Sequence, residues 1–240
     1  MKTDLFGKYI AHRGLHGPDC PENSMCAFEQ AVLAGLPIEL DVRLTRDGKV
    51  AVFHDADLMR MCGVEGKISD FSYVQLTPFR LKGTGEGIPL FKDVLKQVNG
   101  RVPLLVEIKN CSFPMLEKRT ARLLDCYKGE YAVQSFDPFA MLWFRLFRPE
   151  TVRGLLISTN PGGRFGEYIA RLITSRPWFW RLVVKPDFIS VDRRTLSPSI
   201  IKAARKSGAD LFVWTVRTPG QEQLVSDPAV RHLIFEDYRP

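Results

Sequence analysis

The feature that most constrains the fold is the regular alternation of short, apolar, β-branched runs with helical patterns along the whole chain. Eight runs are expected to be strands: Tyr9–His12, Pro37–Val42, Val102–Ile108, Tyr131–Gln134, Arg153–Ile157, Phe188–Val191, Leu211–Thr215 and His232–Phe235. The segments expected to be helices are Ser24–Leu33, Leu90–Val98, Pro114–Cys126, Pro138–Phe147, Gly166–Ile173, Ser197–Lys206 and Gln221–Val225. This alternation predicts right-handed βαβ units and a parallel sheet that is buried on both faces.

Eight such units in 240 residues predict an α/β protein, a TIM (β/α)8 barrel forming a single domain over residues 1–240. A doubly wound open sheet is the competing fold, but no G-x-G-x-x-G motif follows the first expected strand. Lys49–His54 follows the turn sequence Thr45–Gly48 and is expected to pair with the second strand as a hairpin. Residues 55–87 contain frequent glycines without a strong helix or strand pattern. We interpret them as a small insertion over one face of the barrel.

Composition narrows the class of protein further. Hydrophobic residues make up 45% and charged residues 25% of the chain, which excludes disordered and fibrous proteins. No apolar stretch is long enough for a spanning helix, and the first residues do not resemble a signal peptide. The five cysteines are an odd number without a C-x-x-C pair, which argues against a disulfide framework and a structural zinc site. We therefore expect a reduced cytoplasmic protein in which Cys20 and Cys26 are packing residues.

The net charge of +7 is concentrated in residues 141–185. Two acidic residues, Glu150 and Glu167, stand in this stretch against eight basic residues, Arg145, Arg148, Arg153, Arg164, Arg171, Arg176, Arg181 and Lys185. Its aromatic residues include Trp143, Phe144, Phe147, Trp178, Phe179 and Trp180. A solvated helix face with buried aromatic residues is one interpretation. Peripheral contact with an anionic membrane is the other, and nucleic acid is the weaker alternative.

Charged residues stand inside or at the ends of the expected apolar strands, where burying a charge is unfavourable unless it is paired or binds a metal. Glu39 and Asp41 are two positions apart, so both side chains share one face of the expected strand. Further such residues come at the ends of other expected strands: His12, Arg13, His54, Glu107 and Lys109. Because the carboxyl ends of barrel strands meet at one mouth, we expect these seven side chains to converge there.

The chemistry of this set points to a metal and an anion. Carboxylates gathered at a partly buried site repel one another unless a cation or metal compensates them. Oxygen ligands without cysteine suit Mg²⁺ or Ca²⁺. Arg13 and Lys109 would leave positive charge for a phosphate, and the two histidines could act as acid and base. Structural ion pairs between Glu39 or Glu107 and these cations are the alternative.

An ordered series of motifs resembles the glycerophosphodiester phosphodiesterase family. The series comprises His12-Arg13-Gly14, Pro21-Glu22-Asn23-Ser24, Glu39-Leu40-Asp41-Val42, Thr45-Arg46-Asp47-Gly48, Phe53-His54-Asp55, Ile88-Pro89-Leu90, Glu107-Ile108-Lys109, Gln134-Ser135-Phe136, Trp214-Thr215-Val216 and Glu236-Asp237-Tyr238. Each triplet alone is weak, but the matches run in order over nearly the whole chain.

The resemblance implies a TIM barrel and assigns roles to residues. It implies metal ligation by Glu39, Asp41 and Glu107, acid–base roles for His12 and His54, and phosphate contacts from Arg13 and Lys109. Independently, the position of Trp214 near the end of the seventh expected strand makes it a candidate substrate-binding residue, with a buried tryptophan of the barrel core as the alternative.

Two motifs depart from the family pattern. Arg60-Met61-Cys62 stands where the family usually has Arg-Thr-Thr, and Glu236-Asp237-Tyr238-Arg239 where it usually has Thr-Asp-Tyr-Pro. These departures affect the predicted leaving group more than the predicted chemistry.

The sequence therefore predicts a metal-dependent phosphodiesterase of glycerol and lipid metabolism. It would hydrolyse glycerophosphodiesters to an alcohol and glycerol 3-phosphate, with one Mg²⁺ or Ca²⁺ and two-histidine acid–base catalysis. Lysophospholipase D-type hydrolysis of lysophospholipids is one alternative, for which a membrane contact would serve. A non-catalytic barrel that binds anionic lipid or RNA is the other, although a binding module needs no acid–metal constellation.

Overall fold

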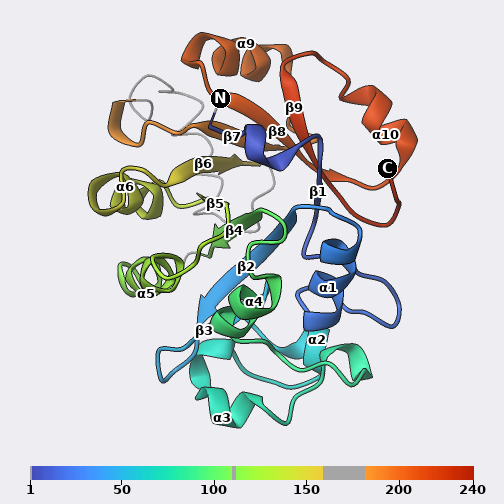
Figure 1. Ribbon diagram of the computed structural model, residues 1–240, viewed down its shortest axis with the longest axis vertical. Helices are drawn as coiled ribbons and strands as arrows, with labels where there is room; N and C mark the ends of the chain where they lie inside the picture. Colours follow the sequence, from blue (N-terminus) through green and yellow to red (C-terminus); the bar gives the residue numbers. More distant parts are fainter. Residues whose placement is uncertain (1, 110–111, 159–181) are drawn as a thin grey trace. The chain divides into compact units, whose positions relative to one another are not determined.

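The computed structural model describes residues 2–109, 112–158 and 182–240, which separate into two compact units (Figure 1). One unit is Ala11–Glu130, and the other joins Met1–Ile10 to Tyr131–Pro240. The predicted helix over Gly166–Ile173 and the aromatic residues Trp178–Trp180 lie outside the described residues.

In the unit Ala11–Glu130, β2 (Ile38–Leu44) is the central strand. It pairs in parallel with the end of β1 (Tyr9–Ala11) and with β4 (Leu104–Ile108). On its C-terminal half it also pairs antiparallel with β3 (Val50–Val52), which confirms the predicted hairpin. Nearly every residue of β2 and β4 is buried, as expected for strands covered on both faces.

This unit has three long helices, and a capping residue marks the start of the first. In α1 (Met25–Leu33) the Ser24 side chain accepts a hydrogen bond from the backbone N of Ala27, which caps the helix. Apolar residues of α4 (Phe91–Val98) recur on one face and are buried. The third long helix, α5 (Met115–Leu124), contacts β2 and β3. Figure 1 shows α1 and α4 beside each other near β2.

Residues 55–87, which show no strong helix or strand pattern in the sequence, do contain short helical turns. They form four single-turn elements, which are α2 (Met59–Cys62), η2 (Ile68–Asp70), α3 (Tyr73–Leu76) and η3 (Leu81–Gly83). These elements surround a small core of their own, made of Ala51, Phe53, Leu58, Met61, Ile68, Leu76, Leu81 and Ile88. A single turn is too short to show a helical period in the sequence, so these four elements could not be predicted from periodicity. The capping box of Ser72 and Gln75 is the one signal that could have located α3.

The other unit carries parallel strands in the order of the sequence. They are β5 (Tyr131–Ser135), β6 (Val152–Ile157), β7 (Phe188–Asp192), β8 (Asp210–Val216) and β9 (Val230–Phe235), each paired with the next. Helix α6 (Pro138–Phe147) contacts β5 and β6, and α9 (Pro198–Ser207) and α10 (Pro219–Leu224) contact β8. A short turn, η1 (Asp4–Phe6), precedes β1. Among the described helices, none has the length and apolar composition that a membrane-spanning helix needs.

The core of this unit contains a stack of aromatic rings. Phe188 and Phe212 stack with ring centroids 4.3 Å apart, and the edge of Phe6 meets the Phe212 ring. Gly154 on β6 makes room for this stack, because a Cβ atom there would lie 2.1 Å from the Phe188 ring. A glycine inside a buried strand therefore has a packing reason here.

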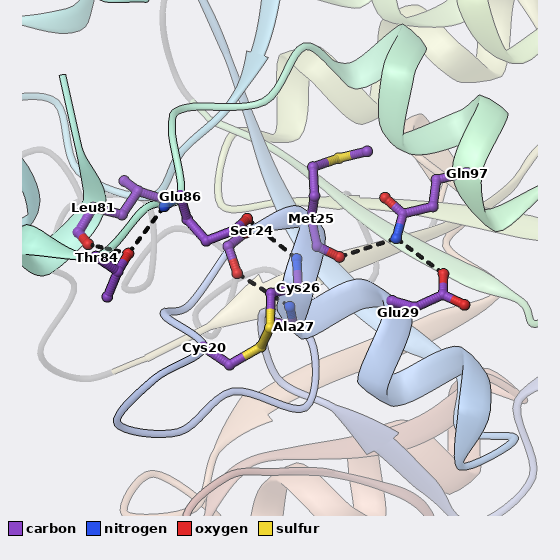
Figure 2. Close-up of a disulfide and its surroundings, with 10 residues drawn as sticks. All are labelled: Cys20, Ser24, Met25, Cys26, Ala27, Glu29, Leu81, Thr84, Glu86 and Gln97. Carbon is purple, nitrogen blue, oxygen red and sulfur yellow. Dashed lines mark hydrogen bonds between the residues drawn. A yellow bond between two sulfur atoms is a disulfide. The ribbon is translucent and has the colours of Figure 1, made fainter. Parts of the chain in front are cut away.

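The expectation that Cys20 and Cys26 are unbonded packing residues is wrong, because they form a disulfide (Figure 2). An odd total number of cysteines does not exclude a local pair, and the turn between the two residues brings their Cα atoms to 5.5 Å. The bridge closes the segment that leads into α1. At the second cysteine of the bridge, the backbone N of Cys26 donates a hydrogen bond to Glu86 (Figure 2). In the same region, the side chain of Gln97 donates hydrogen bonds to the Met25 carbonyl and to Glu29 (Figure 2).

Candidate functional site

The site is built around three buried carboxylates on two adjacent strands. Glu39 and Asp41 share one face of β2, and Asp41 is the direct register partner of Glu107 on β4. Their exposed fractions are 2%, 1% and 6%, and one oxygen from each lies within 4.8 Å of the others. Parallel pairing in this register therefore produces the convergence that the sequence predicted.

Two cations border the carboxylates. Nζ of Lys109 lies 2.8 Å from Oδ1 of Asp41 and 2.5 Å from Oε1 of Glu107. The backbone N of Arg13 donates to Oε2 of Glu39 at 3.1 Å, and its guanidinium Nε lies 3.4 Å from Oδ2 of Asp41. The structural ion pairs considered as an alternative are thus present, but two cationic side chains face three carboxylates.

The pKa values show which carboxyl group is least compensated. Burial raises the pKa of Glu39 well above its usual range, and the charges of Asp41 and Glu107 raise it further. Burial alone would also raise the pKa of Asp41, but Lys109, His54 and Arg13 together hold it well below its usual range. The cluster therefore favours additional positive charge near Glu39.

A divalent cation fits this donor set. The three carboxylates supply oxygen ligands, which suit a hard cation, and their spacing allows one ion to contact all three. Such an ion would also supply the charge that Glu39 lacks.

The loop after β1 has a backbone that requires its glycine. Arg13 and Gly14 both adopt positive φ angles, 55° and 83°. A Cβ atom at Gly14 would lie 2.9 Å from the backbone of Ala27, so a side chain cannot be placed there without moving α1. This conformation directs the backbone N of Arg13 toward Glu39.

Asn23 belongs to the site although the sequence did not single it out. Its side chain donates to Oδ2 of Asp41 at 2.8 Å and accepts from the backbone N of Asp41 at 3.3 Å. It also adopts a left-handed backbone, with φ 56°, in the turn that the Cys20–Cys26 disulfide closes. The Pro21-Glu22-Asn23-Ser24 motif was the available signal.

The two predicted acid–base histidines occupy different surroundings. His12 follows β1 and is 9% exposed, with Nε2 4.0 Å from Oε2 of Glu39. His54 follows β3, and about a third of its side chain is exposed. Its Nδ1 lies 2.6 Å from Oδ1 of Asp55, and its carbonyl accepts a hydrogen bond from Arg43. The unit Ala11–Glu130 therefore contains seven of the predicted residues: the three carboxylates, Arg13, Lys109 and both histidines.

Trp214, the predicted substrate-binding residue, lies in the other compact unit near the end of β8. Its ring meets Phe136 edge-on with centroids 5.8 Å apart, and its buried indole Nε1 has no hydrogen-bond partner among the residues that the structure describes. A contact between Trp214 and a substrate stays a prediction.

Comparison with known proteins identifies the family of this chain. Residues 12–237 match the model of the glycerophosphoryl diester phosphodiesterase family. The chain belongs to this family. A glycerophosphodiester phosphodiesterase from Caldanaerobacter subterraneus subsp. tengcongensis is 29% identical over 95% of this chain and 93% of its own. Membership confirms the resemblance and identifies the protein as a phosphodiesterase of glycerophosphodiesters.

Two further similarities bear on fold and substrate. A phosphodiesterase from Oleispira antarctica, solved in complex with the product sn-glycerol-3-phosphate, superposes with a TM-score of 0.82 at 19% identity, covering 99% of this chain and 95% of the other. This likeness confirms the predicted TIM barrel. The lysophospholipase D GDPD1 of Rattus norvegicus is 34% identical over 54% of this chain and 45% of its own length.

Glu22 carries charge beyond the carboxylate cluster. It accepts hydrogen bonds from Arg13 at 2.6 Å and from Arg60 at 2.7 and 2.8 Å. Burial alone would raise the pKa of Glu22, but the two guanidinium groups lower it to about 2 from an ordinary 4.5. The ionised form is therefore stabilised by folding.

This shift predicts an acid-dependent loss of stability. Because the folded pKa is the lower one, the contribution of Glu22 is complete above pH 4.5 and disappears as the pH falls toward 2. We expect Glu22→Gln to lower the free energy of unfolding at neutral pH and to reduce its decline on acidification, measured by urea unfolding from pH 6 to 3. Glu29→Gln, which removes a more exposed carboxylate paired with Arg101, is the control. Identical acid dependence in wild type and Glu22→Gln would contradict the assignment.

Proposed function

We propose that this chain hydrolyses glycerophosphodiesters to an alcohol and glycerol 3-phosphate in a reaction that depends on one divalent cation. The observation that carries the proposal is the buried triad of Glu39, Asp41 and Glu107, bordered by Lys109 and Arg13. A binding module has no need of three buried carboxylates whose repulsion opposes folding. The product in the Oleispira antarctica complex supports glycerol 3-phosphate as the product here.

Glu39, Asp41 and Glu107 would hold the cation, which their oxygen donors favour to be Mg²⁺ or Ca²⁺. When bound, the cation supplies positive charge that polarises the phosphoryl group and lowers the pKa of a substrate hydroxyl. Arg13 and Lys109 place further positive charge beside the triad, where it stabilises the charge that develops on the phosphoryl oxygens. Trp214 would pack against the glycerol or alkyl part of the substrate.

His12 and His54 would transfer the protons. One removes a proton from the attacking oxygen, that of a substrate hydroxyl or of water, as its bond to phosphorus forms, and the other protonates the alcohol oxygen as its bond to phosphorus breaks. Where the substrate hydroxyl attacks, water then opens the cyclic phosphate that results, which gives glycerol 3-phosphate. The Asp55 carboxylate on Nδ1 of His54 supports this role, because a proton held on Nδ1 leaves Nε2 as the acceptor. The distance of 4.0 Å between Nε2 of His12 and Oε2 of Glu39 supports His12 as the other residue that transfers a proton.

Hydrolysis of glycerophosphocholine, followed by the release of glycerol 3-phosphate, tests this proposal. We expect turnover in Mg²⁺ or Ca²⁺, loss of turnover in chelator, and recovery when the ion is returned. His12→Ala and His54→Ala should each lower kcat by at least about 100-fold, the lower range for loss of a general acid or base, while the unfolding transition stays cooperative. Full activity in either variant contradicts the two-histidine mechanism, and full activity in chelator contradicts the cation requirement.

We further propose lysophospholipids as a second substrate class, reached through peripheral contact with an anionic membrane. Helix α6 begins three residues before the 141–185 stretch and continues into it. Three of its apolar side chains are exposed, with exposed fractions of 51% for Phe139, 64% for Leu146 and 57% for Phe147. Their spacing places them on one face of the helix. The family relation to the lysophospholipase D GDPD1 of Rattus norvegicus also supports this substrate class.

Vesicle binding tests the membrane contact. Serine at both Leu146 and Phe147 should weaken binding to vesicles of anionic phospholipid at low salt and spare the hydrolysis of glycerophosphocholine, because apolar insertion is lost and the triad is unchanged. Leu224→Ser, which alters an exposed leucine on α10, is the matched control. Failure of the wild-type protein to bind such vesicles would contradict the proposal.

The remaining predictions stay proposals of the same kind. We regard the chain as one barrel domain over residues 1–240, with residues 55–87 as its insertion. A cytoplasmic location remains a prediction from the sequence, against which the Cys20–Cys26 disulfide stands. Nucleic acid binding remains the disfavoured alternative.

A further inference from the structure

Arg60 on α2 bridges two carboxylates that the predicted site does not include. Its guanidinium donates through both terminal nitrogens to Glu22, at 2.7 and 2.8 Å, and through Nε to Oδ2 of Asp55 at 2.5 Å. A planar guanidinium is suited to this geometry, because its donors point in fixed directions. Its side chain is 43% exposed, so it reaches these partners from the surface of the unit.

Each of the two carboxylates has its other contact inside the predicted site. The second oxygen of Asp55, Oδ1, lies 2.6 Å from Nδ1 of His54. Glu22 also accepts a hydrogen bond from Nη1 of Arg13 at 2.6 Å. Charges of alternating sign therefore run from Arg13 through Glu22 and Arg60 to Asp55, whose other oxygen contacts the His54 ring.

Both carboxylates remain ionised at neutral pH, which this arrangement requires. Burial alone would raise the pKa of Asp55, but hydrogen bonds with His54 and Arg60 lower it below its usual range. The pKa of Arg60 is raised in return, chiefly by its hydrogen bonds to Glu22. An ionised Asp55 fixes the proton on Nδ1 of His54 only while the carboxylate keeps its orientation, and Arg60 holds its other oxygen.

We propose that Arg60 is a positioning residue, which orients His54 through Asp55 and Arg13 through Glu22. This inference rests on the proposed function, because it assigns Arg60 to the same reaction. It predicts two separate kinetic effects. Loss of control over His54 lowers kcat alone, since His54 would transfer a proton, whereas loss of control over Arg13 also raises KM, since Arg13 would bind the phosphate before the reaction as well as during it.

Steady-state hydrolysis of glycerophosphocholine by substituted enzymes gives the first test. We expect Arg60→Gln to lower kcat/KM by about 10- to 100-fold, the range found when a partner that orients an active-site group is removed. Arg60→Lys, which keeps the charge without the planar donors, should recover part of the loss. Arg101→Gln is the matched control, because Arg101 is also 43% exposed and also donates twice to one glutamate, Glu29. It should leave kcat/KM within about twofold of wild type.

Double variants separate positioning from general destabilisation. In an Asp55→Asn background, Arg60→Gln should produce little further loss of kcat, because the group through which it acts is already changed. In a Glu22→Gln background, its effect on KM should likewise shrink. Full, additive effects in both backgrounds would overturn the proposal, as would a kcat/KM for Arg60→Gln within twofold of wild type.

The tautomer of His54 provides a readout that is independent of turnover. The chain has four histidines, so nitrogen NMR of the histidine-labelled protein can resolve the ring of His54 under conditions where it is neutral. We expect a proton on Nδ1 in wild type and a mixture of tautomers in Arg60→Gln. Unchanged tautomer signals would overturn the proposal. If wild type has no hydrolase activity, the proposed function fails, and the NMR comparison alone still decides the role of Arg60.

Discussion

The repulsion among three buried carboxylates is the constraint on which the rest of the unit Ala11–Glu130 depends. Parallel pairing of β2 with β4 places Asp41 directly opposite Glu107, and the two-residue spacing adds Glu39 to the same face. Lys109, which directly follows β4, compensates part of this charge, and further positive charge has to come from other parts of the structure. The loop after β1 already places Arg13 beside the triad, and a divalent cation bound by the three carboxylates would add further positive charge.

The loop between β1 and α1 meets this requirement through its backbone. Left-handed conformations at Arg13 and Asn23 direct a backbone N toward Glu39 and an amide side chain toward Asp41. The Cys20–Cys26 disulfide closes the turn that contains Asn23, and Gly14 lets the loop lie against α1. Outside this layer, Arg60 joins Glu22 to Asp55. Ion pairs of alternating sign thus connect the buried carboxylates of the strands to the exposed guanidinium of Arg60.

The sequence was sufficient to predict the strands and the residues that stand on them. Period-two alternation and apolar runs fix which face a strand side chain occupies, so the convergence of Glu39, Asp41 and Glu107 followed from spacing. Asn23 and Arg60 were missed because their contacts depend on turn conformation and on single-turn helices, which leave no periodic pattern. The disulfide was missed because an odd total of cysteines does not exclude a pair that is close in sequence. The conformations of turns and single-turn helices depend on tertiary contacts, which the periodicity of apolar residues in the sequence does not show.

Calorimetric titration of the purified protein with Ca²⁺ and Mg²⁺ tests the central claim most directly. The account predicts that wild type binds one ion and that Glu39→Gln, which resembles the protonated form of a carboxyl with a raised pKa and should therefore fold, binds it more than about 100-fold more weakly. Glu29→Gln, on the surface of the same unit, should bind like wild type. A wild-type protein that binds neither ion, or a Glu39→Gln variant that binds as tightly as wild type, would contradict the account.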